Sequence, residues 1–254
     1  AGTPFFEIVD DPALTTAVTE ARAELFRSRK PDARLHACLL VKETDSRWRR
    51  GGYEETVTSY PASTVKLCYL AAAMHYAKEN GKAPDWLDAS VRPMIHVSSN
   101  TATGEVVDAI TGAPNTTTGD LEQWNEKRRQ TAKLVESRGL LGNQNIINKT
   151  YPSNSGDEPK DYEGEAFKRF GSNKLQPGLM AELMLEIVKG KMAPEAQDYM
   201  IGLLTHERFS IQTPFGTGVP PGSVYINKGG WTSTTLSDVA YVKLPNGREF
   251  ILVA

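Results

Sequence analysis

The sequence predicts an α/β protein of the α+β type, in which an antiparallel sheet flanked by helices lies beside a helical domain. Three observations support this. Strand-like segments lie near the two ends of the chain, helical periodicity fills the middle, and 254 residues allow one large domain or two small ones. The sheet domain is therefore expected in residues 1–58 and 208–254, and the helical domain in 59–207. The seam between them is the default place for a pocket.

The first expected elements are a helix and a pair of strands. Residues 12–28 carry apolar side chains at three- and four-residue steps, which is typical of an amphipathic helix, and Pro31 ends it. Residues 35–41 are an apolar run of strand length, and residues 53–59 are rich in β-branched side chains. Turn signals at 45–46 and 51–52 lie between these two segments, so we expect a strand pair.

The middle of the chain is predominantly helical. Residues 63–80 predict a strong helix that Ser63 or Thr64 caps and Gly81 ends. Residues 98–110, 120–137 and 177–189 also show helical periodicity. Between the last two, residues 142–174 are polar with little apolar periodicity, and a connection of this length is usually functional or disordered.

Strands return at the end of the sequence. Residues 224–228, 237–244 and 249–253 have strand character, and Pro245-Asn246-Gly247 predicts a hairpin turn between the last two. These strands are expected to join those near the start in one sheet.

The composition excludes several classes of protein. A net charge of −2 and a pI of about 6.2 argue against a broad nucleic-acid-binding face. No apolar run approaches the ~20 residues of a membrane helix, and the four histidines show no metal-ligand spacing. Cys38 and Cys68 are too few for a disulfide scaffold. They could form one bridge, but two small buried side chains are the simpler interpretation.

The first candidate for chemistry is Ser63 with Lys66, because residues three apart share one face of a helix. A serine nucleophile needs a base within hydrogen-bond reach, and a lysine serves when burial or a neighbouring cation lowers its pKa. The helix N-terminus also offers backbone N–H groups to an oxyanion. S-x-x-K is common by chance and serine often caps helices, so this motif alone does not decide the function.

Two further motifs carry useful groups. S-S-N at 98–100 offers a hydroxyl and an amide to one cleft, although a capped helix start explains it equally well. K-G-G at 228–230 offers a cation for a carboxylate and glycines that let a ligand approach the backbone. The ordinary alternative is a turn that ends a strand, with a solvent-exposed lysine.

Together, the three motifs resemble those of the serine β-lactamases and penicillin-binding proteins, which carry S-x-x-K, S-D-N and K-T-G in this order. The stretch around Ser98 is most similar to class A enzymes, where S-D-N is commonly followed by Thr-Ala. The resemblance runs from about Leu35 to the end of the sequence. It implies a β-lactamase/transpeptidase-like fold with the active site at the seam of the two domains.

The resemblance also implies a role for each matching residue. Ser63 would be the acylated nucleophile, Lys66 its partner, and Ser98 the donor of a proton to the leaving nitrogen. Lys228 would support Ser98 and the substrate carboxylate. The implied substrate-binding residues are Asn100, Gly230, Trp231 and Thr232. The backbone N–H groups of Ser63 and Trp231 would form the oxyanion hole.

The sequence departs from the family pattern where turnover is decided. Class A enzymes hold the deacylating water with a loop glutamate, and the nearest match, K-T-Y-P-S-N at 149–154, puts Tyr151 in its place. A phenol with an ordinary pKa near 10 is a poor base at pH 7. Five loop acids could reach the site or be solvated surface charges: Asp157, Glu158, Asp161, Glu163 and Glu165. Gly229 also replaces a hydroxyl that binds the substrate carboxylate, a role that Thr232 or Ser233 could take over.

These features predict a class A-like serine β-lactamase that opens the β-lactam amide through a Ser63 acyl-enzyme, with impaired or unconventional deacylation. The alternatives are a D,D-peptidase or esterase of the same superfamily and a non-turnover penicillin-binding sensor. The expected partner is a small-molecule β-lactam or acyl-peptide substrate, with no cofactor, metal, nucleic acid or membrane segment. We expect a monomeric bacterial antibiotic-resistance protein, periplasmic or secreted, whose signal peptide has been removed. The family usually continues into a C-terminal helix after the last strand.

Overall fold

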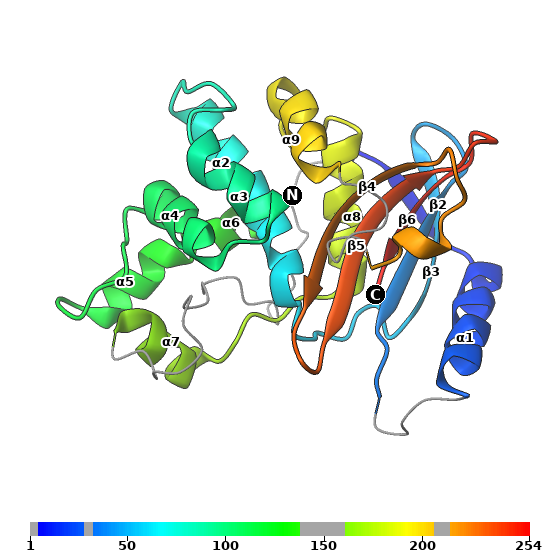
Figure 1. The fold of residues 1–254 in the computed structure, drawn as a ribbon, viewed down its shortest axis with the longest axis horizontal. Helices are drawn as coiled ribbons and strands as arrows, with labels where there is room; N and C mark the ends of the chain where they lie inside the picture. The colour runs from blue at the N-terminus through cyan, green and yellow to red at the C-terminus, as the bar shows by residue number, and fades with distance from the viewer. Residues whose placement is uncertain (1–4, 28–32, 138–160, 206–213) are drawn as a thin grey trace.

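A six-stranded sheet lies beside a group of helices around α2 in the computed structural model, which describes residues 5–27, 33–137, 161–205 and 214–254 (Figure 1). The strands are β1 (Glu7–Asp10), β2 (Ala37–Lys42), β3 (Arg47–Tyr53), β4 (Val224–Trp231), β5 (Leu236–Lys243) and β6 (Glu249–Val253). The α-helices are α1 (Pro12–Phe26), α2 (Lys66–Glu79), α3 (Asp88–His96), α4 (Asn100–Thr111), α5 (Leu121–Arg128), α6 (Gln130–Ser137), α7 (Tyr162–Phe170), α8 (Pro177–Val188) and α9 (Gln197–Leu204). The described short 3₁₀ helices are η1 (Ala62–Val65), η2 (Pro194–Ala196) and η3 (Gly216–Gly218).

Both ends of the chain build the sheet, as the sequence predicts. The strand order is β1-β3-β2-β6-β5-β4, so β2 from the start pairs directly with β6 from the end. The neighbouring strands run antiparallel except β1, which pairs parallel with β3. The sequence analysis missed β1, a four-residue edge strand. The predicted hairpin turn at 245–247 does connect β5 to β6.

The second strand of the first pair was predicted wrongly. Its predicted range was 53–59, whereas β3 spans Arg47–Tyr53 and contains both Gly51 and Gly52. A Cβ on Gly51 would lie 2.4 Å from the Leu14 Cβ of α1, and a Cβ on Gly52 would lie 2.7 Å from the Ala37 carbonyl oxygen. The two glycines therefore mark a close approach of α1 and β2 to this strand rather than a turn.

The helices differ from the prediction in several places. Helices α3 and α9 were not predicted, and α2 begins at Lys66, after η1, without the side-chain cap predicted for Ser63 or Thr64. Residues 120–137 form two helices, α5 and α6, instead of one. Helix α7 lies within the predicted 142–174 loop, and Asp161 caps it by accepting a hydrogen bond from the Gly164 N–H at 3.1 Å. Helix α8 falls within residues 59–207 but packs against β2, β5 and β6, whereas α1 covers the opposite face of the sheet (Figure 1). The two-domain division itself stays a prediction.

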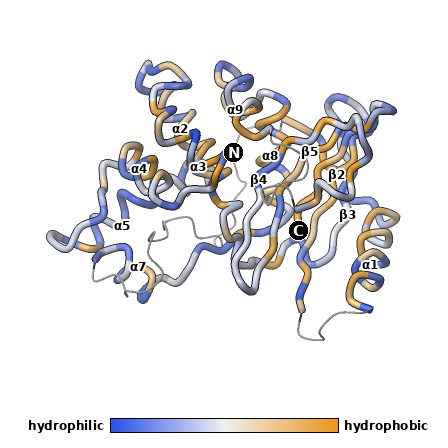
Figure 2. Tube along the Cα trace, viewed as in Figure 1, coloured by the Kyte–Doolittle hydropathy of each residue, from blue (hydrophilic) through white to orange (hydrophobic). Residues whose placement is uncertain are grey.

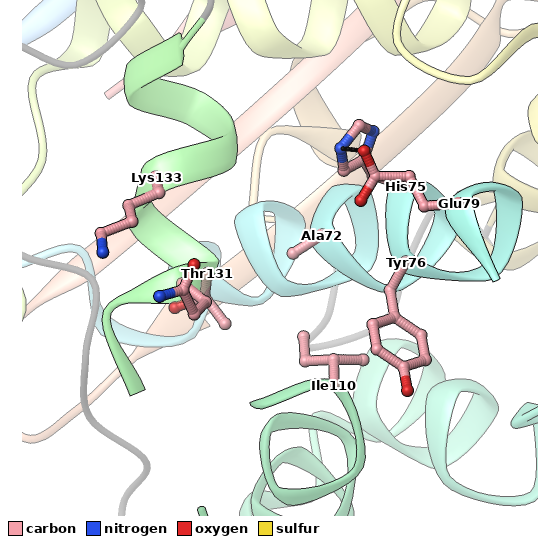
Figure 3. Close-up of a pocket in the computed structure, with 8 residues that line it drawn as sticks. Ala72, His75, Tyr76, Glu79, Ile110, Thr131 and Lys133 are labelled. Carbon is pink, nitrogen blue, oxygen red and sulfur yellow. Dashed lines mark ion pairs between the residues drawn. The ribbon is translucent and has the colours of Figure 1, made fainter. Parts of the chain in front are cut away.

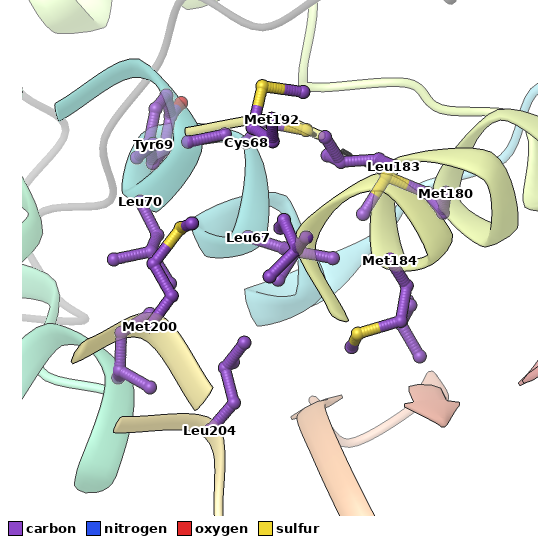
Figure 4. Close-up of a cluster of buried hydrophobic side chains, with 14 of the residues drawn as sticks. Leu67, Cys68, Tyr69, Leu70, Met180, Leu183, Met184, Met192, Met200 and Leu204 are labelled. Carbon is purple, nitrogen blue, oxygen red and sulfur yellow. Dashed lines mark hydrogen bonds between the residues drawn. The ribbon is translucent and has the colours of Figure 1, made fainter. Parts of the chain in front are cut away.

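The core is centred on α2, which is buried on nearly every side. Its residues from Lys66 to Met74 are all buried, so this part of the helix is apolar all round apart from Lys66, whereas the last turn carries exposed polar residues. Figure 4 shows Leu67, Cys68 and Leu70 packed among methionines and leucines of α8 and α9. Figure 2 shows that hydrophobic stretches line the sheet strands and the helices next to them. No helix in the described ranges has the length and apolar character needed to span a membrane.

The two cysteines are free and buried, as the simpler interpretation predicts. Burial raises the pKa of both thiols to about 12, so neither forms a reactive thiolate near neutral pH. The Cys68 sulfur lies 3.8 Å from the Met180 sulfur of α8, which places it in the packed core.

A buried carboxylate fastens the end of α8 to the sheet. Glu249 of β6 accepts hydrogen bonds from Lys42 at 3.0 Å, from the Tyr241 hydroxyl at 2.9 Å and from Lys189, the residue that ends α8. Burial alone would raise the pKa of Glu249. The hydrogen bonds from Lys189, Lys42 and Tyr241 outweigh it and lower the pKa to about 2.

We therefore expect Glu249→Gln to lower the free energy of unfolding at pH 7 by about 1–3 kcal/mol, because Lys189 and Lys42 lose this buried anion, although Lys42 keeps its 2.7 Å contact with Asp45. The folded-state pKa lies below the unfolded one of roughly 4.3. The difference in unfolding free energy between the wild type and Glu249→Gln is therefore largest above about pH 5 and becomes smaller as the pH falls toward 2. Urea unfolding at pH 7, 4 and 3 measures this narrowing gap. Glu43→Gln, at an exposed ion pair with Arg47, is the control and should change stability little. A gap for Glu249→Gln that stays constant down to pH 3 would contradict the assignment.

Candidate active site

The predicted nucleophile, Ser63, lies in η1 just before α2. Ala62, immediately before it, has a left-handed backbone with φ of +47°. Ser63 is partly exposed, whereas Pro61, Ala62, Thr64 and the first residues of α2 are buried. The turn therefore presents one hydroxyl to the outside at the end of a buried helix. A non-glycine residue held at positive φ is a strained feature of the kind that clusters at functional sites.

Lys66 brings the predicted residues together. Its amino group lies 3.1 Å from the Ser63 Oγ, 3.1 Å from the Ser98 Oγ, 2.5 Å from the Ser98 carbonyl oxygen and 2.9 Å from the Asn100 Oδ1. The side chain is fully buried. Burial, and then the charge of Lys228, lower the pKa of Lys66 to about 7. A large share of the molecules therefore carry a neutral amine at Lys66 near pH 7, which can accept a proton from Ser63.

Ser98 occupies the turn between α3 and α4. Its φ is +57°, a conformation that a non-glycine residue rarely adopts, and it precedes Ser99, whose side chain caps α4. This backbone turns both the hydroxyl and the carbonyl of Ser98 toward Lys66. The same hydroxyl lies 3.1 Å from the Lys228 amino group, so Ser98 links two lysines.

Lys228 reaches Ser98 from strand β4. It is fully buried and also donates a hydrogen bond to the Gly229 carbonyl at 2.6 Å. Burial lowers the pKa of Lys228 to about 8, although the negative charge of Asp238 raises it. Lys228 therefore keeps its proton to higher pH than Lys66, and at pH 7 to 8 the two lysines have different charge states.

Strand β4 packs very closely against the nucleophile turn. A Cβ on Gly230 would lie 2.6 Å from the Ser63 backbone nitrogen, so only glycine fits there. The Ser237 hydroxyl of β5 joins the two elements, donating to the Pro61 carbonyl at 3.0 Å and lying 3.2 Å from the Gly230 carbonyl. The Ser63 backbone nitrogen thus lies close to β4, next to the position of Trp231 in the chain, and the oxyanion hole formed by the two N–H groups stays a prediction. No local sequence pattern indicates Ser237, because its role depends on strand pairing.

One predicted substrate-binding residue, Thr232, lies outside this hydrogen-bonded group. Thr232 is exposed in the β4–β5 hairpin, where its Oγ1 accepts hydrogen bonds from the backbone N–H groups of Thr234 at 3.2 Å and Thr235 at 3.0 Å. Its hydroxyl oxygen therefore stabilises the turn, and its role toward a substrate carboxylate stays a prediction. Tyr151, together with Asp157 and Glu158, lies outside the described residues.

The three described acids of the long loop have other partners. Asp161 caps α7 and accepts a hydrogen bond from Asn115 at 2.6 Å, and Glu165 lies 3.5 Å from Lys168. Glu163 pairs with the buried Arg128 at 2.8 Å. None of these contacts involves Ser63, Lys66 or Ser98. These contacts anchor α7 to Asn115 and to Arg128 of α5.

A separate cavity of about 560 Å³ lies between α2, α4 and α6 (Figure 3). His75 and Glu79 form an ion pair of 3.0 Å at its edge, and Tyr76 and Ile110 line it. It contains none of the predicted catalytic residues. Among the described residues, no group of three or more His, Cys, Asp or Glu side chains is arranged to hold a metal ion.

Comparison with known proteins agrees with this geometry. Residues 80–254 match the model of Beta-lactamase2, described as the beta-lactamase enzyme family. The chain belongs to this family. The match includes Ser98 and Lys228 but begins after Ser63 and Lys66, whose assignment rests on their place in the structure.

Relatives extend the likeness over the whole chain. Golvesin of Dictyostelium discoideum is 34% identical over 256 residues, which cover 97% of this chain but 44% of Golvesin. The chain thus spans less than half the length of that relative. PBP-A has the same fold, with a TM-score of 0.67 and 18% identity over 97% of this chain and 88% of its own. The TLA-1 extended spectrum beta-lactamase matches with a TM-score of 0.67 and 14% identity over 94% and 89%. The β-lactamase/transpeptidase-like fold is therefore confirmed.

The left-handed backbone at Ser98 leads to a prediction about stability. Ser98→Gly and Ser98→Ala remove the same hydroxyl, but only glycine adopts a φ of +57° without strain. We expect Ser98→Gly to be more stable than Ser98→Ala by about 1 kcal/mol. The urea midpoints of the two variants measure the difference. An alanine variant as stable as the glycine variant would show that the turn is unstrained.

Proposed function

We propose that this family member is a serine hydrolase of the β-lactamase type that forms an acyl-enzyme on Ser63. The observation that carries the proposal is the buried amine of Lys66, 3.1 Å from both the Ser63 and Ser98 hydroxyls, with a pKa of about 7. A base with a pKa near the working pH is effective in general-base catalysis.

The acylation step follows from these contacts. Neutral Lys66 takes the Ser63 proton as Oγ forms a bond to the lactam carbonyl carbon, and the negative charge develops on the carbonyl oxygen beside the Ser63 and Trp231 N–H groups. When the carbonyl reforms, the C–N bond breaks and Ser98 gives its proton to the departing nitrogen. Lys66 then returns the first proton to Ser98 across the 3.1 Å contact. The net transfer is one proton from Ser63 to nitrogen.

Lys228 supplies positive charge to this step. Its ammonium lies 3.1 Å from the Ser98 Oγ, so it makes that hydroxyl a better proton donor. A carboxylate on the substrate, as in β-lactams and peptide C-termini, would find its cation at the same lysine. The substrate class that best fits is therefore a β-lactam or an acyl-peptide with a nearby carboxylate.

Deacylation is the step on which the candidates differ. Asp161, Glu163 and Glu165 are engaged away from the nucleophile, and a tyrosine in place of the family glutamate is a poor base. This favours, as a second candidate, a D,D-peptidase, esterase or penicillin-binding sensor with a long-lived acyl-enzyme. One structure similar to this chain in fold is a PBP-A L158E mutant described as an acyl-enzyme complex with penicillin G.

The setting of the whole protein is also a proposal. The chain covers less than half of Golvesin, which comes from a eukaryote. A bacterial origin and a role in antibiotic resistance therefore lack support from this relative. The periplasmic or secreted location and the monomeric state stay predictions.

The proposal is tested by stopped-flow mixing of the protein with excess chromogenic cephalosporin, followed by intact mass analysis at the plateau. Wild-type protein should open at least one equivalent of the lactam, and Ser63→Ala should open none. Turnover beyond one equivalent identifies a β-lactamase, whereas a one-equivalent burst with a stable adduct identifies the slow-deacylating candidate. If the wild-type protein gives no burst and no adduct, the proposal is overturned for β-lactams.

The two lysines predict a narrow pH optimum for acylation. The rate constant should rise as Lys66 loses its proton near pH 7 and fall as Lys228 loses its own near pH 8. Arginine does not deprotonate in this range. Lys228→Arg should therefore remove the alkaline fall and keep the acid rise. The pseudo-first-order acylation rate between pH 5.5 and 10 measures both limbs, and a plateau up to pH 10 in the wild type would contradict the lysine assignments.

A further inference from the structure

A second buried polar group lies directly behind Lys228. Side chains alternate between the faces of a strand, so Lys228 faces the site while Tyr225 and Asn227 of β4 face the opposite side. Asp238 of β5 is paired with Gly229 and lies on that same rear face. One thickness of sheet separates it from Lys228.

The Asp238 carboxylate is enclosed by neutral donors. It accepts hydrogen bonds from the Asn227 amide at 2.8 Å, from the Tyr225 hydroxyl and from the Phe215 backbone N–H at 3.3 Å. Both Asp238 and Asn227 are fully buried. Its own backbone pairs with Ala254 in both directions. The position of this carboxylate is therefore fixed from two strands and from the segment that precedes η3.

Among the described charges, Asp238 is the anion that acts on Lys228, and Lys228 is the cation that acts on Asp238. Lys228 meets the like charge of Lys66 from α2 and two neutral groups, the Ser98 hydroxyl and the Gly229 carbonyl. On the rear face, Asp238 meets the three neutral donors, and the cation acting on it is Lys228. A buried carboxylate is costly without compensation, and a buried ammonium beside a second lysine is equally so.

We propose that Asp238 is a positioning residue whose charge acts through the sheet to keep Lys228 protonated, and thereby keeps Ser98 and the substrate carboxylate facing a cation. The inference rests on the acylation role given to Lys228 above. Asn227 and Tyr225 hold the carboxylate in place. A purely structural Asp238 would instead only fix the Phe215 segment on the sheet.

The charge on Asp238 also depends on pH. Burial raises the pKa of Asp238 to about 6. The hydrogen bonds from Tyr225, Asn227 and Phe215 and the positive charge of Lys228 lower this pKa but do not outweigh burial. At pH 7 to 8 the carboxyl is therefore mostly ionised. Its influence on Lys228 is present across the range in which Lys66 becomes neutral.

The direct test is an NMR titration of Lys228 with ¹³Cε-labelled lysine, assigned by its loss in Lys228→Arg, which requires no substrate. In Asp238→Asn, Lys228 should titrate lower than in the wild type by about half to one pH unit. Asp238→Glu, which keeps a carboxylate at this position, is the matched control and should leave the Lys228 titration closer to that of the wild type than Asp238→Asn does. Asp238→Ser is a second neutral variant should Asp238→Asn fail to fold.

Acylation kinetics supply the functional readout. In Asp238→Asn, the pH at which the acylation rate begins to fall should be lower by the same half to one unit. The acylation rate at pH 9 should therefore be about three- to tenfold lower than in the wild type. In a Lys228→Arg background, the same substitution should leave the high-pH rate unchanged, because arginine keeps its charge. An unchanged Lys228 titration in a folded Asp238→Asn variant overturns the inference. Because that titration is independent of catalysis, it stands even if no β-lactam acylates Ser63.

Discussion

The Ser98 hydroxyl lies 3.1 Å from the amino groups of two buried lysines, and the rest of the site is arranged around this contact. Two ammonium groups so close in a buried region repel each other, so one of them loses its proton near neutral pH. Lys66 is that group, because burial and the charge of Lys228 both lower its pKa, whereas the charge of Asp238 raises the pKa of Lys228. A base and a cation therefore meet at one hydroxyl.

The fold keeps these charges in place by tight packing. Helix α2 is buried all round, which fixes Lys66 at its first turn. Gly230 lets β4 approach the Ser63 turn, and that strand carries Lys228 to the opposite side of Ser98. The left-handed backbone of Ser98 places its hydroxyl between the two lysines. Since each element comes from a different part of the chain, the site forms only when the sheet and the helices are assembled.

Much of this could be predicted from the sequence, and the failures have physical reasons. The three motifs identified Ser63, Lys66, Ser98 and Lys228, because S-x-x-K puts both groups on one helix face and the other motifs keep their order along the chain. Gly51 and Gly52 were interpreted as a turn, because a local pattern does not distinguish a turn from a close approach by α1. Asp238 and Ser237 could not be found, since their partners are set by strand register rather than by spacing.

Catalysis at this site requires Lys66 to be a neutral base at working pH. An NMR titration of the wild-type protein with ¹³Cε-labelled lysine, with Lys66 assigned by its loss in Lys66→Arg, measures its protonation state. The Lys66 resonance should titrate near pH 7, about three units below an ordinary lysine. If the Lys66 amine stays protonated up to pH 10, Ser63 lacks its base and the assignment of Lys66 is wrong.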